Sequence, residues 1–144
     1  MADIISEAFK QAAAKLKSVG DDIDKLPKIV STFLIVYSAQ GVLDNGGYRY
    51  FFESDWPDNQ QYSKFIEACS EIGCIKQSTE LARVISTFPF ENPHLDESAR
   101  NKYIDSNLDE EEFELKGWGD ALCGDQEVWT KLEAYYLDNK EEFV

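Results

Sequence analysis

Histidine is almost missing from this chain, since His94 is the only one among 144 residues. That scarcity excludes histidine-rich metal sites and weakens any catalytic triad that needs a histidine base. Cysteine is also sparse, and Cys69, Cys74 and Cys123 form no C-x-x-C pair, which favours a reduced protein with cysteines packed as small core residues. The common phosphate-loop, dinucleotide, zinc-protease and nucleophile-elbow motifs do not occur. We therefore expect no enzymatic activity, no metal and no cofactor.

Long apolar runs and targeting features are missing as well. The most apolar stretch, residues 29–39, contains Ser31 and Thr32 and is far shorter than the ~20 residues that span a bilayer. Residues 1–16 carry Asp3 and Glu7 and lack the basic and apolar regions of a secretion signal. These absences predict a cytoplasmic protein that is not bound to a membrane.

Basic residues are the third deficit. The chain has 14 lysines and arginines against 28 aspartates and glutamates, a formal charge of −14. Direct binding to nucleic acid or to an anionic membrane is therefore disfavoured, because phosphate would be repelled. Residues 1–90 hold 12 acids and 9 bases, a net of −3, whereas residues 91–144 hold 16 acids and 5 bases, a net of −11. Such asymmetry indicates an acidic functional face or tail in the later part of the chain.

What remains is the composition of a folded protein. Hydrophobic residues make up 43% of the chain and aromatic residues 13%, and apolar residues recur at helical spacing almost throughout. A chain of 144 residues suits one domain. The sequence predicts the all-α fold class, a single compact multi-helix domain over residues 1–144 with about seven or eight short helices.

The individual helices follow from apolar spacing and capping residues. The first, residues 4–16, ends before Gly20, and the second, residues 29–37, follows Pro27 and is apolar on most sides, as expected of a central buried helix. Further helices are expected at residues 48–52, 62–72, 81–88, through Tyr103 and Ile104, and at 128–136. The expected N-caps are Asp58 or Asn59 for residues 62–72, Ser78 for residues 81–88, and Asp125 for residues 128–136.

A glycine pair interrupts the second helical segment. The sequence Asp44-Asn45-Gly46-Gly47 predicts a helix end and a sharp re-entry into a short helix that carries Tyr48, Phe51 and Phe52 on one face. A phosphate cradle is disfavoured here, because no lysine, serine or threonine follows the glycines and Asp44 adjoins them. We expect a structural role, in which glycine lets the backbone turn or approach closely.

Residues 105–112 form an acidic run with two interpretations. It is not an EF-hand loop, since Glu110 and Lys116 stand where glycine and glutamate are needed. In the favoured interpretation Asp109 is a helix N-cap with Glu112 at the N3 position. In the other interpretation, five negative charges lie along about 7.5 Å of helix. That charge density is comparable to the density of duplex DNA, which carries one phosphate charge per ~1.7 Å of its axis. Those five residues are Asp109, Glu110, Glu111, Glu112 and Glu114, and one set of side chains can serve both roles.

Residues 37–54, with Asn45-Gly46-Gly47 followed by Tyr48 and the pair Phe51-Phe52, resemble the DNA-mimic protein 19-like family of bacteria. In that family the segment is followed by a helix ending in an Ile-Gly-small motif, here Ile72-Gly73-Cys74, so the resemblance covers about residues 30–90. Tyr50 stands where the family usually has glutamine. The resemblance implies a mostly helical fold, in which Asn45, Gly46, Gly47, Tyr48, Phe51 and Phe52 are a structural signature. It also implies an acidic dimer whose charges imitate DNA phosphates on the DNA-binding face of a transcription regulator.

These observations favour a non-enzymatic acidic protein that binds a basic protein partner. The resemblance implies that this partner is a DNA-binding regulator. We also expect that the protein can form a homodimer. One alternative is an immunity protein that neutralises a basic nuclease toxin. Another is a small-ligand or enzymatic pocket around Asn45, Tyr48, Tyr50 and Trp56. The candidate partner-binding residues are Asp105, Asp109, Glu110, Glu111, Glu112, Glu114, Asp120 and Asp125.

Overall fold

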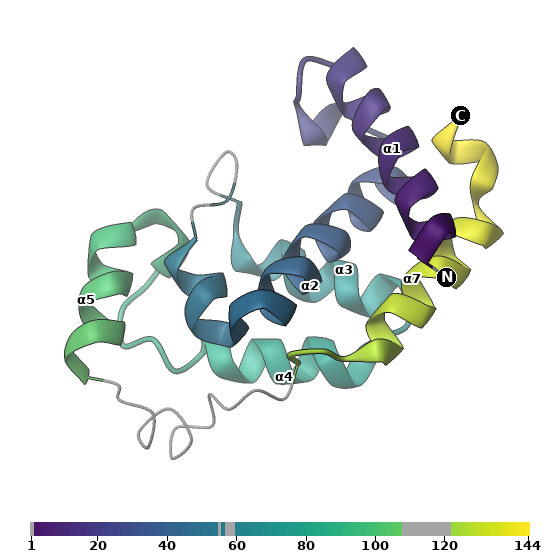
Figure 1. The fold of residues 1–144 in the computed structure, drawn as a ribbon. Coiled ribbons are helices and arrows are strands. Elements are labelled where there is room, and N and C mark those ends of the chain that lie inside the picture. Colours follow the sequence, from purple (N-terminus) through teal and green to yellow (C-terminus); the bar gives the residue numbers. More distant parts are fainter. Residues whose placement is uncertain (1, 55, 57–59, 108–121) are drawn as a thin grey trace.

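The computed structural model describes residues 2–54, 56, 60–107 and 122–144. These residues form six α-helices, three 3-10 helices and no strand, which confirms the all-α prediction with somewhat fewer α-helices than expected. The elements, shown in Figure 1, are α1 (Ala2–Ser18), η1 (Ile23–Lys25), α2 (Lys28–Glu53), α3 (Tyr62–Glu71), α4 (Ile75–Ile85), η3 (Pro93–Leu95), α5 (Glu97–Asn107), α7 (Gln126–Asp138) and η4 (Lys140–Phe143).

Helix α2 is the central element of the molecule. It packs against α1, α3, α5 and α7, and it runs through the middle of the ribbon in Figure 1. The separate helices predicted at residues 29–37 and 48–52 are two parts of this one helix, joined across a kink at Gly47. The interruption predicted at the glycine pair is present as this kink, where Gly47 leaves helical geometry. Because the two segments are counted as one element, the number of α-helices is lower than predicted.

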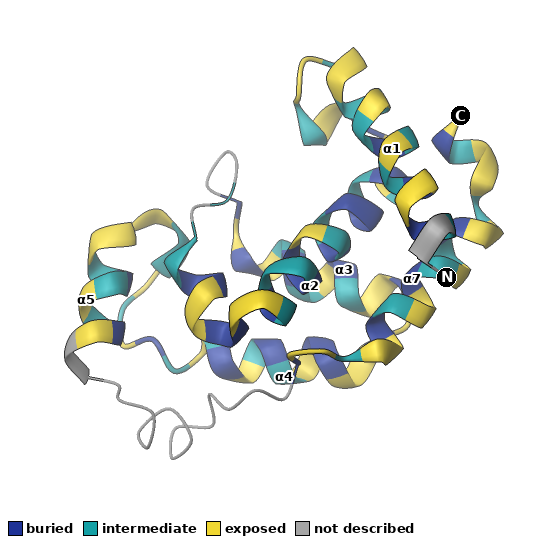
Figure 2. Ribbon diagram, viewed as in Figure 1, coloured by how far each residue is buried: buried dark blue, intermediate teal, exposed yellow. Residues whose placement is uncertain are grey.

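Two hydrophobic clusters meet along α2. The first joins its early residues, including Phe33, to α1, α7 and η4, with Leu132 and Tyr136 as buried α7 side chains. The second joins its later residues, including Phe51 and Phe52, to α3, α4 and α5. Figure 2 shows the buried residues turned inward on each helix and the exposed residues on the outer faces. One helix therefore stabilises both ends of the molecule through apolar burial.

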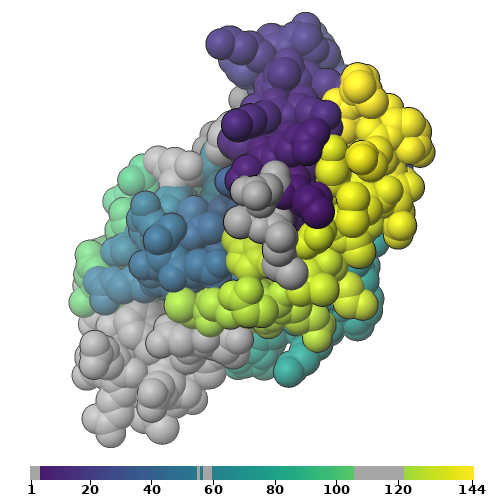
Figure 3. Space-filling view, turned by 45° about the vertical axis from the view of Figure 1, so that its right-hand side comes forward, coloured from purple at the N-terminus to yellow at the C-terminus, as the bar shows by residue number. Residues whose placement is uncertain are grey.

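The two ends of the chain lie together. Helix α1 packs against α7 and η4, and Figure 3 shows the purple N-terminal helix beside the yellow C-terminal residues. Tyr136 of α7 donates its hydroxyl to Gln11 Oε1 of α1 at 2.9 Å. The C-terminal residues therefore belong to the folded core, and they do not form a tail.

Two of the expected helix starts are wrong. Helix α3 begins at Tyr62 after Gln61, so neither Asp58 nor Asn59, which lie outside the described residues, is its N-cap. Helix α4 begins at Ile75, because Gly73 with φ 93° ends the previous helix and allows an immediate restart. Ser78 therefore lies inside α4, where its hydroxyl donates to the Ile75 carbonyl at 3.0 Å. Asp125 is the N-cap of α7 as expected.

Arg100 ties α5 to the end of α2, a role that no sequence pattern indicated. Its side chain is only 1% exposed. The Nε–H donates to the Phe52 carbonyl at 2.9 Å, and Nη1 donates to the Pro93 carbonyl at 2.7 Å. A helix leaves its last carbonyls without backbone partners, and the planar guanidinium supplies donors for one of them.

Candidate functional site

The Asn-Gly-Gly motif forms the kink of α2. Gly47 has φ 64° and ψ −159°, a combination open almost only to glycine. Gly46 stays helical, but a Cβ atom there would lie 2.4 Å from the Tyr50 Cβ, so any side chain would force Tyr50 to move. Asn45 is exposed and donates its amide to the Gly41 carbonyl one turn earlier at 2.8 Å. The geometry explains the two glycines as requirements of the backbone.

The aromatic residues after the kink fill the core. Tyr48, Phe51 and Phe52 are at most 2% exposed. Phe51 and Phe52 stack edge to face at 5.0 Å between ring centroids, and Phe52 meets Phe88 of the loop after α4 at 5.0 Å. Packed aromatic rings occupy the space around Tyr48, one of the four residues of the small-ligand or enzymatic pocket that the sequence left open as an alternative. Asn45 and Tyr50 lie on the exposed side of the helix.

The phenol of Tyr48 takes part in a polar contact at the edge of this core. Its hydroxyl donates to Glu80 Oε1 at 3.4 Å, and Arg83 Nε donates to Glu80 Oε2 at 3.1 Å. Burial, and next the charge of Glu80, raise the pKa of Tyr48 well above its usual range. The phenol therefore stays protonated at neutral pH and fixes the motif against α4.

Asp44, immediately before the motif, anchors the C-terminal part of the chain. Its Oδ1 accepts from the Gly124 backbone N–H at 2.7 Å and from Gln40 Nε2 at 2.7 Å, and its Oδ2 accepts from Trp129 Nε1 at 2.8 Å. Gln40 also donates to the Leu122 carbonyl at 2.7 Å. These bonds join α2 to residues about 80 positions later and place the start of α7.

Two of the predicted partner-binding acids lie in the described residues, and both make internal contacts. Asp105 of α5 is exposed, yet its Oδ1 lies 2.6 Å from Nη2 of Arg49 in α2. Asp125 caps α7 by accepting from the Glu127 N–H at 2.9 Å, and its other oxygen accepts from Gln77 Nε2 at 3.1 Å. Arg49 also lies 3.5 Å from Glu53, so one guanidinium offsets two carboxylates.

The structure does not bring these two acids into one contact. Asp105 and Asp125 are held by different elements: α5, at the left edge of the ribbon in Figure 1, and α7, which lies to the right of its centre. The other six candidate acids lie outside the described residues: Asp109, Glu110, Glu111, Glu112, Glu114 and Asp120.

Other acids on the described surface were not among the predicted site residues. The described ion pairs involve four acids, Asp24, Glu53, Glu80 and Asp105. The count of charges could have indicated some of the remaining acids, because four of the seven named next fall in residues 91–144. It could not distinguish exposed acids from acids that cap helices. Exposed acids outside these ion pairs include Glu7, Glu67, Glu71, Glu91, Glu127, Asp138 and Glu141.

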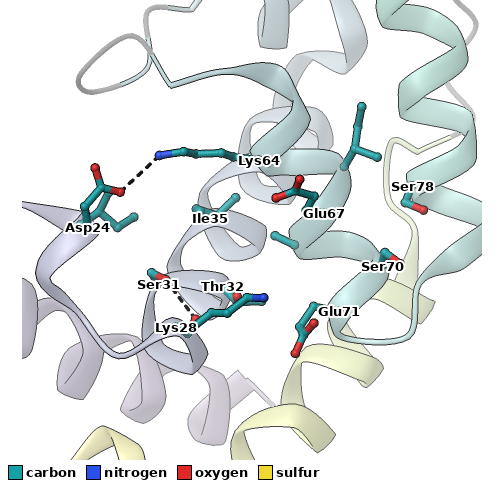
Figure 4. A pocket seen from close by; sticks show the side chains of 13 residues that line it. Asp24, Lys28, Ser31, Thr32, Ile35, Lys64, Glu67, Ser70, Glu71 and Ser78 are labelled. Carbon is teal, nitrogen blue, oxygen red and sulfur yellow. Dashed lines mark hydrogen bonds and ion pairs between the residues drawn. The ribbon is translucent and has the colours of Figure 1, made fainter.

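A polar groove of about 670 Å³ lies between η1, the start of α2 and α3. Figure 4 shows the pair formed by Lys64 Nζ and Asp24 Oδ1, 3.2 Å apart, with Lys28 and Glu71 toward the other end. Hydroxyl groups such as that of Ser31 line it, but its described lining includes no histidine or cysteine. Mixed charge makes the groove a poor match for a uniformly basic surface, and the described lining supplies no nucleophile with an adjacent histidine base.

The thiols of Cys69 and Cys74 show no sign of activation. Burial, and next the neighbouring Cys74, raise the pKa of the Cys69 thiol to about 12, and burial raises that of Cys74 to about 11. Both thiols are therefore protonated and unreactive at neutral pH. His94 packs against Tyr62 with ring centroids 6.1 Å apart. Among the described residues, no group of three or more histidine, cysteine or acidic side chains is placed to hold a metal ion.

Within the part of the chain that the structure describes, no helix combines the length and the apolar character that a bilayer crossing needs.

A comparison with known protein families gives a match that covers the kinked helix α2 and its glycine pair. A family model described as DMP19-like protein matches residues 24–140, which include the glycine pair and every element from α2 to α7. The match confirms the resemblance and extends it beyond residues 30–90. No curated protein and no solved structure matches the chain. By this match over most of its length, the chain belongs to the DMP19-like protein family.

Proposed function

We propose that this protein is a non-enzymatic binding protein whose acidic surface docks onto a basic protein, and that the partner is a DNA-binding regulator whose DNA site it occupies by imitating phosphate charge. The observation that carries the proposal is the charge distribution: −14 overall, with −11 in residues 91–144. Membership of the DMP19-like family supports the same function. Opposite charge across an interface speeds encounter and suppresses wrong partners.

The described residues add support of two kinds. Exposed acids such as Glu91, Asp138 and Glu141 reach solvent, so their charge is available to a partner. The two buried thiols and the protonated Tyr48 offer no activated nucleophile or base, which supports a binding role over catalysis. Asp105 and Asp125 contribute less to a docking face than the sequence suggested, since both are engaged within the chain.

The proposal is tested by capture and competition. The purified protein is immobilised, partners are captured from a lysate of the source cells, and the captured protein is identified by mass spectrometry. We expect a DNA-binding protein that is released by duplex DNA carrying its site and whose affinity falls as salt rises from 50 to 200 mM, since exposed charge pairs are screened. A captured partner that duplex DNA does not displace at 50 mM salt contradicts the mimicry. A captured basic nuclease indicates the immunity function instead.

A further inference from the structure

The polar groove of Figure 4 contains charges of both signs that no described residue pairs. Lys64 and Asp24 pair with each other at 3.2 Å, which leaves Lys28, Glu67 and Glu71. None of these three side chains forms an ion pair or a hydrogen bond with any residue that the structure describes. Lys28 therefore lies beyond ion-pair distance from both glutamates, although all three line one groove.

The two signs lie on facing walls of the groove. Lys28 and Thr32 share one face of α2, and Glu67 and Glu71 share one face of α3, because helix residues four positions apart are neighbours. Figure 4 shows the first pair on one side of the groove and the second pair on the other. Thr32 is only 4% exposed and still lines the groove, so its side chain lies at the floor.

This combination selects the charge of a ligand. Single charged side chains on an open surface are hydrated by water and need no partner, but here a cation faces two carboxylates across a concave space of about 670 Å³. An anion would meet both glutamates and the formal charge of −14. A ligand with positive charge alone would leave Lys28 without a partner. A molecule that carries one ammonium and one carboxylate matches both walls.

We propose that the groove binds a free α-amino acid with an aliphatic side chain. The ligand carboxylate accepts from the Lys28 ammonium and from the Thr32 hydroxyl. The ligand ammonium donates to Glu67 and Glu71, and such charge-assisted hydrogen bonds are stronger than neutral ones. The aliphatic side chain packs against Ile35, which lines the same groove. The inference goes beyond the proposed function, because it does not use the acids of residues 91–144.

Three related probes test the charge requirement. L-Leucine carries both charges, its methyl ester keeps only the ammonium, and N-acetyl-L-leucine keeps only the carboxylate. Each is titrated into the full chain labelled with ¹⁵N at about pH 6, where the ester amine is protonated. Leucine is expected to shift the backbone signals of residues 28–35 and 64–71, while those of residues 97–105 in α5 stay in place. Each masked probe should bind at least about tenfold more weakly, the value of one charge-assisted hydrogen bond.

Variants assign each charge of the ligand to its wall. Lys28→Met should bind leucine at least about tenfold more weakly than the parent and lose the preference for leucine over its ester. The Glu67→Gln, Glu71→Gln variant should lose the preference for leucine over N-acetyl-leucine. Lys17→Met, at an exposed base of α1 outside the groove, makes the same charge change as Lys28→Met and should bind leucine like the parent. Circular dichroism establishes that each variant is folded.

Three results would overturn the amino-acid site. Leucine could shift no signal of the groove, either masked probe could bind as tightly as leucine, or Lys28→Met could bind leucine as tightly as the parent. None of these results bears on the binding of a basic protein, which the capture experiment tests separately.

Discussion

Trp129 donates its indole N–H to Oδ2 of Asp44 across 2.8 Å, and the two residues are 85 positions apart in the sequence. The same carboxylate accepts from the Gly124 backbone through its other oxygen. Asp44 therefore joins the part of α2 just before Gly46 and Gly47 to helix α7. The kink at Gly47 and the placement of α7 therefore depend on nearby residues of α2.

Replacing Asp44 by asparagine should destabilise the fold by about 2 kcal/mol, because an asparagine amide has one acceptor oxygen and its NH₂ would face at least one of the donors from Gly124 and Trp129. Urea unfolding measures the loss. The matched control is Asp138→Asn, at an exposed acid of α7, which should change the free energy of unfolding by less than about 0.5 kcal/mol. Equal losses for the two variants would contradict the anchoring role.

Alanine substitutions at two glycines of α2 should have opposite effects. Gly47→Ala should destabilise by about 1–3 kcal/mol, because its φ of 64° with ψ of −159° strains any L side chain. Gly41→Ala should stabilise by about 0.5–1 kcal/mol, since a Cβ there meets nothing within 4 Å and helical alanine is favoured over glycine. Thermal and urea unfolding of both variants measure the signs. A neutral or stabilising Gly47→Ala would show that the kink is not required.

Removing the buried guanidinium should be costly. Arg100→Met should lower the free energy of unfolding by about 2–4 kcal/mol, because the Phe52 and Pro93 carbonyls lose their donors while the apolar part of the side chain is retained. Lys102→Met, at an exposed base on the same helix, is the control and should stay within about 0.5 kcal/mol of the parent. A loss no larger than the control's would contradict the assigned role of Arg100.

Stability should fall in alkaline solution. The pKa of Cys69 rises from 9.0 to about 12 on folding and that of Cys74 from 9.0 to about 11. Above pH 9 the unfolded thiols ionise while the folded thiols stay protonated, so the unfolded state is favoured as pH rises from about 9 through 11. Urea midpoints at pH 7, 9 and 10.5 measure the effect. A Cys69→Ala, Cys74→Ala variant should show a smaller decline with pH than the parent, and an identical decline would refute the thiol contribution.

The sequence predicted the parts of the fold that depend on local patterns. Apolar spacing placed α1 and α7, Asp125 was identified as the cap of α7, and Gly73 as the end of α3. Ser78 was misplaced because a serine can cap a helix or, as here, donate to a carbonyl one turn back. Arg100 could not be predicted, since its partners are backbone carbonyls 48 and 7 positions away and carry no sequence signature.

The candidate site was harder to predict, because charge counts do not reveal contacts. Asp105 and Asp125 stood out as acids in an acidic region, but the fold places Arg49 beside the first and Gln77 beside the second. The exposed acids Glu67 and Glu71 lie in the nearly neutral part of the chain, so the regional excess gave them no weight.

The proposed binding of a basic partner by acids of residues 91–144 is tested with two matched charge variants. One neutralises Asp109, Glu110, Glu111, Glu112 and Glu114 as amides, and the other neutralises five exposed acids of residues 1–90, namely Glu7, Asp21, Asp24, Glu67 and Glu71. Each changes the formal charge from −14 to −9, so net charge is the same in both.

The measurement is the dissociation constant of each variant for the captured partner at 50 mM salt, with circular dichroism to establish that both are folded. The first variant is expected to bind at least about tenfold more weakly than the parent, and the second within about threefold. Five charge pairs with the partner, each contributing a few tenths of a kcal/mol, together reach the ~1.4 kcal/mol of a tenfold change in the dissociation constant. Equal weakening in the two variants would show that the partner senses only total charge. Unchanged affinity in the first would show that these acids do not contact it.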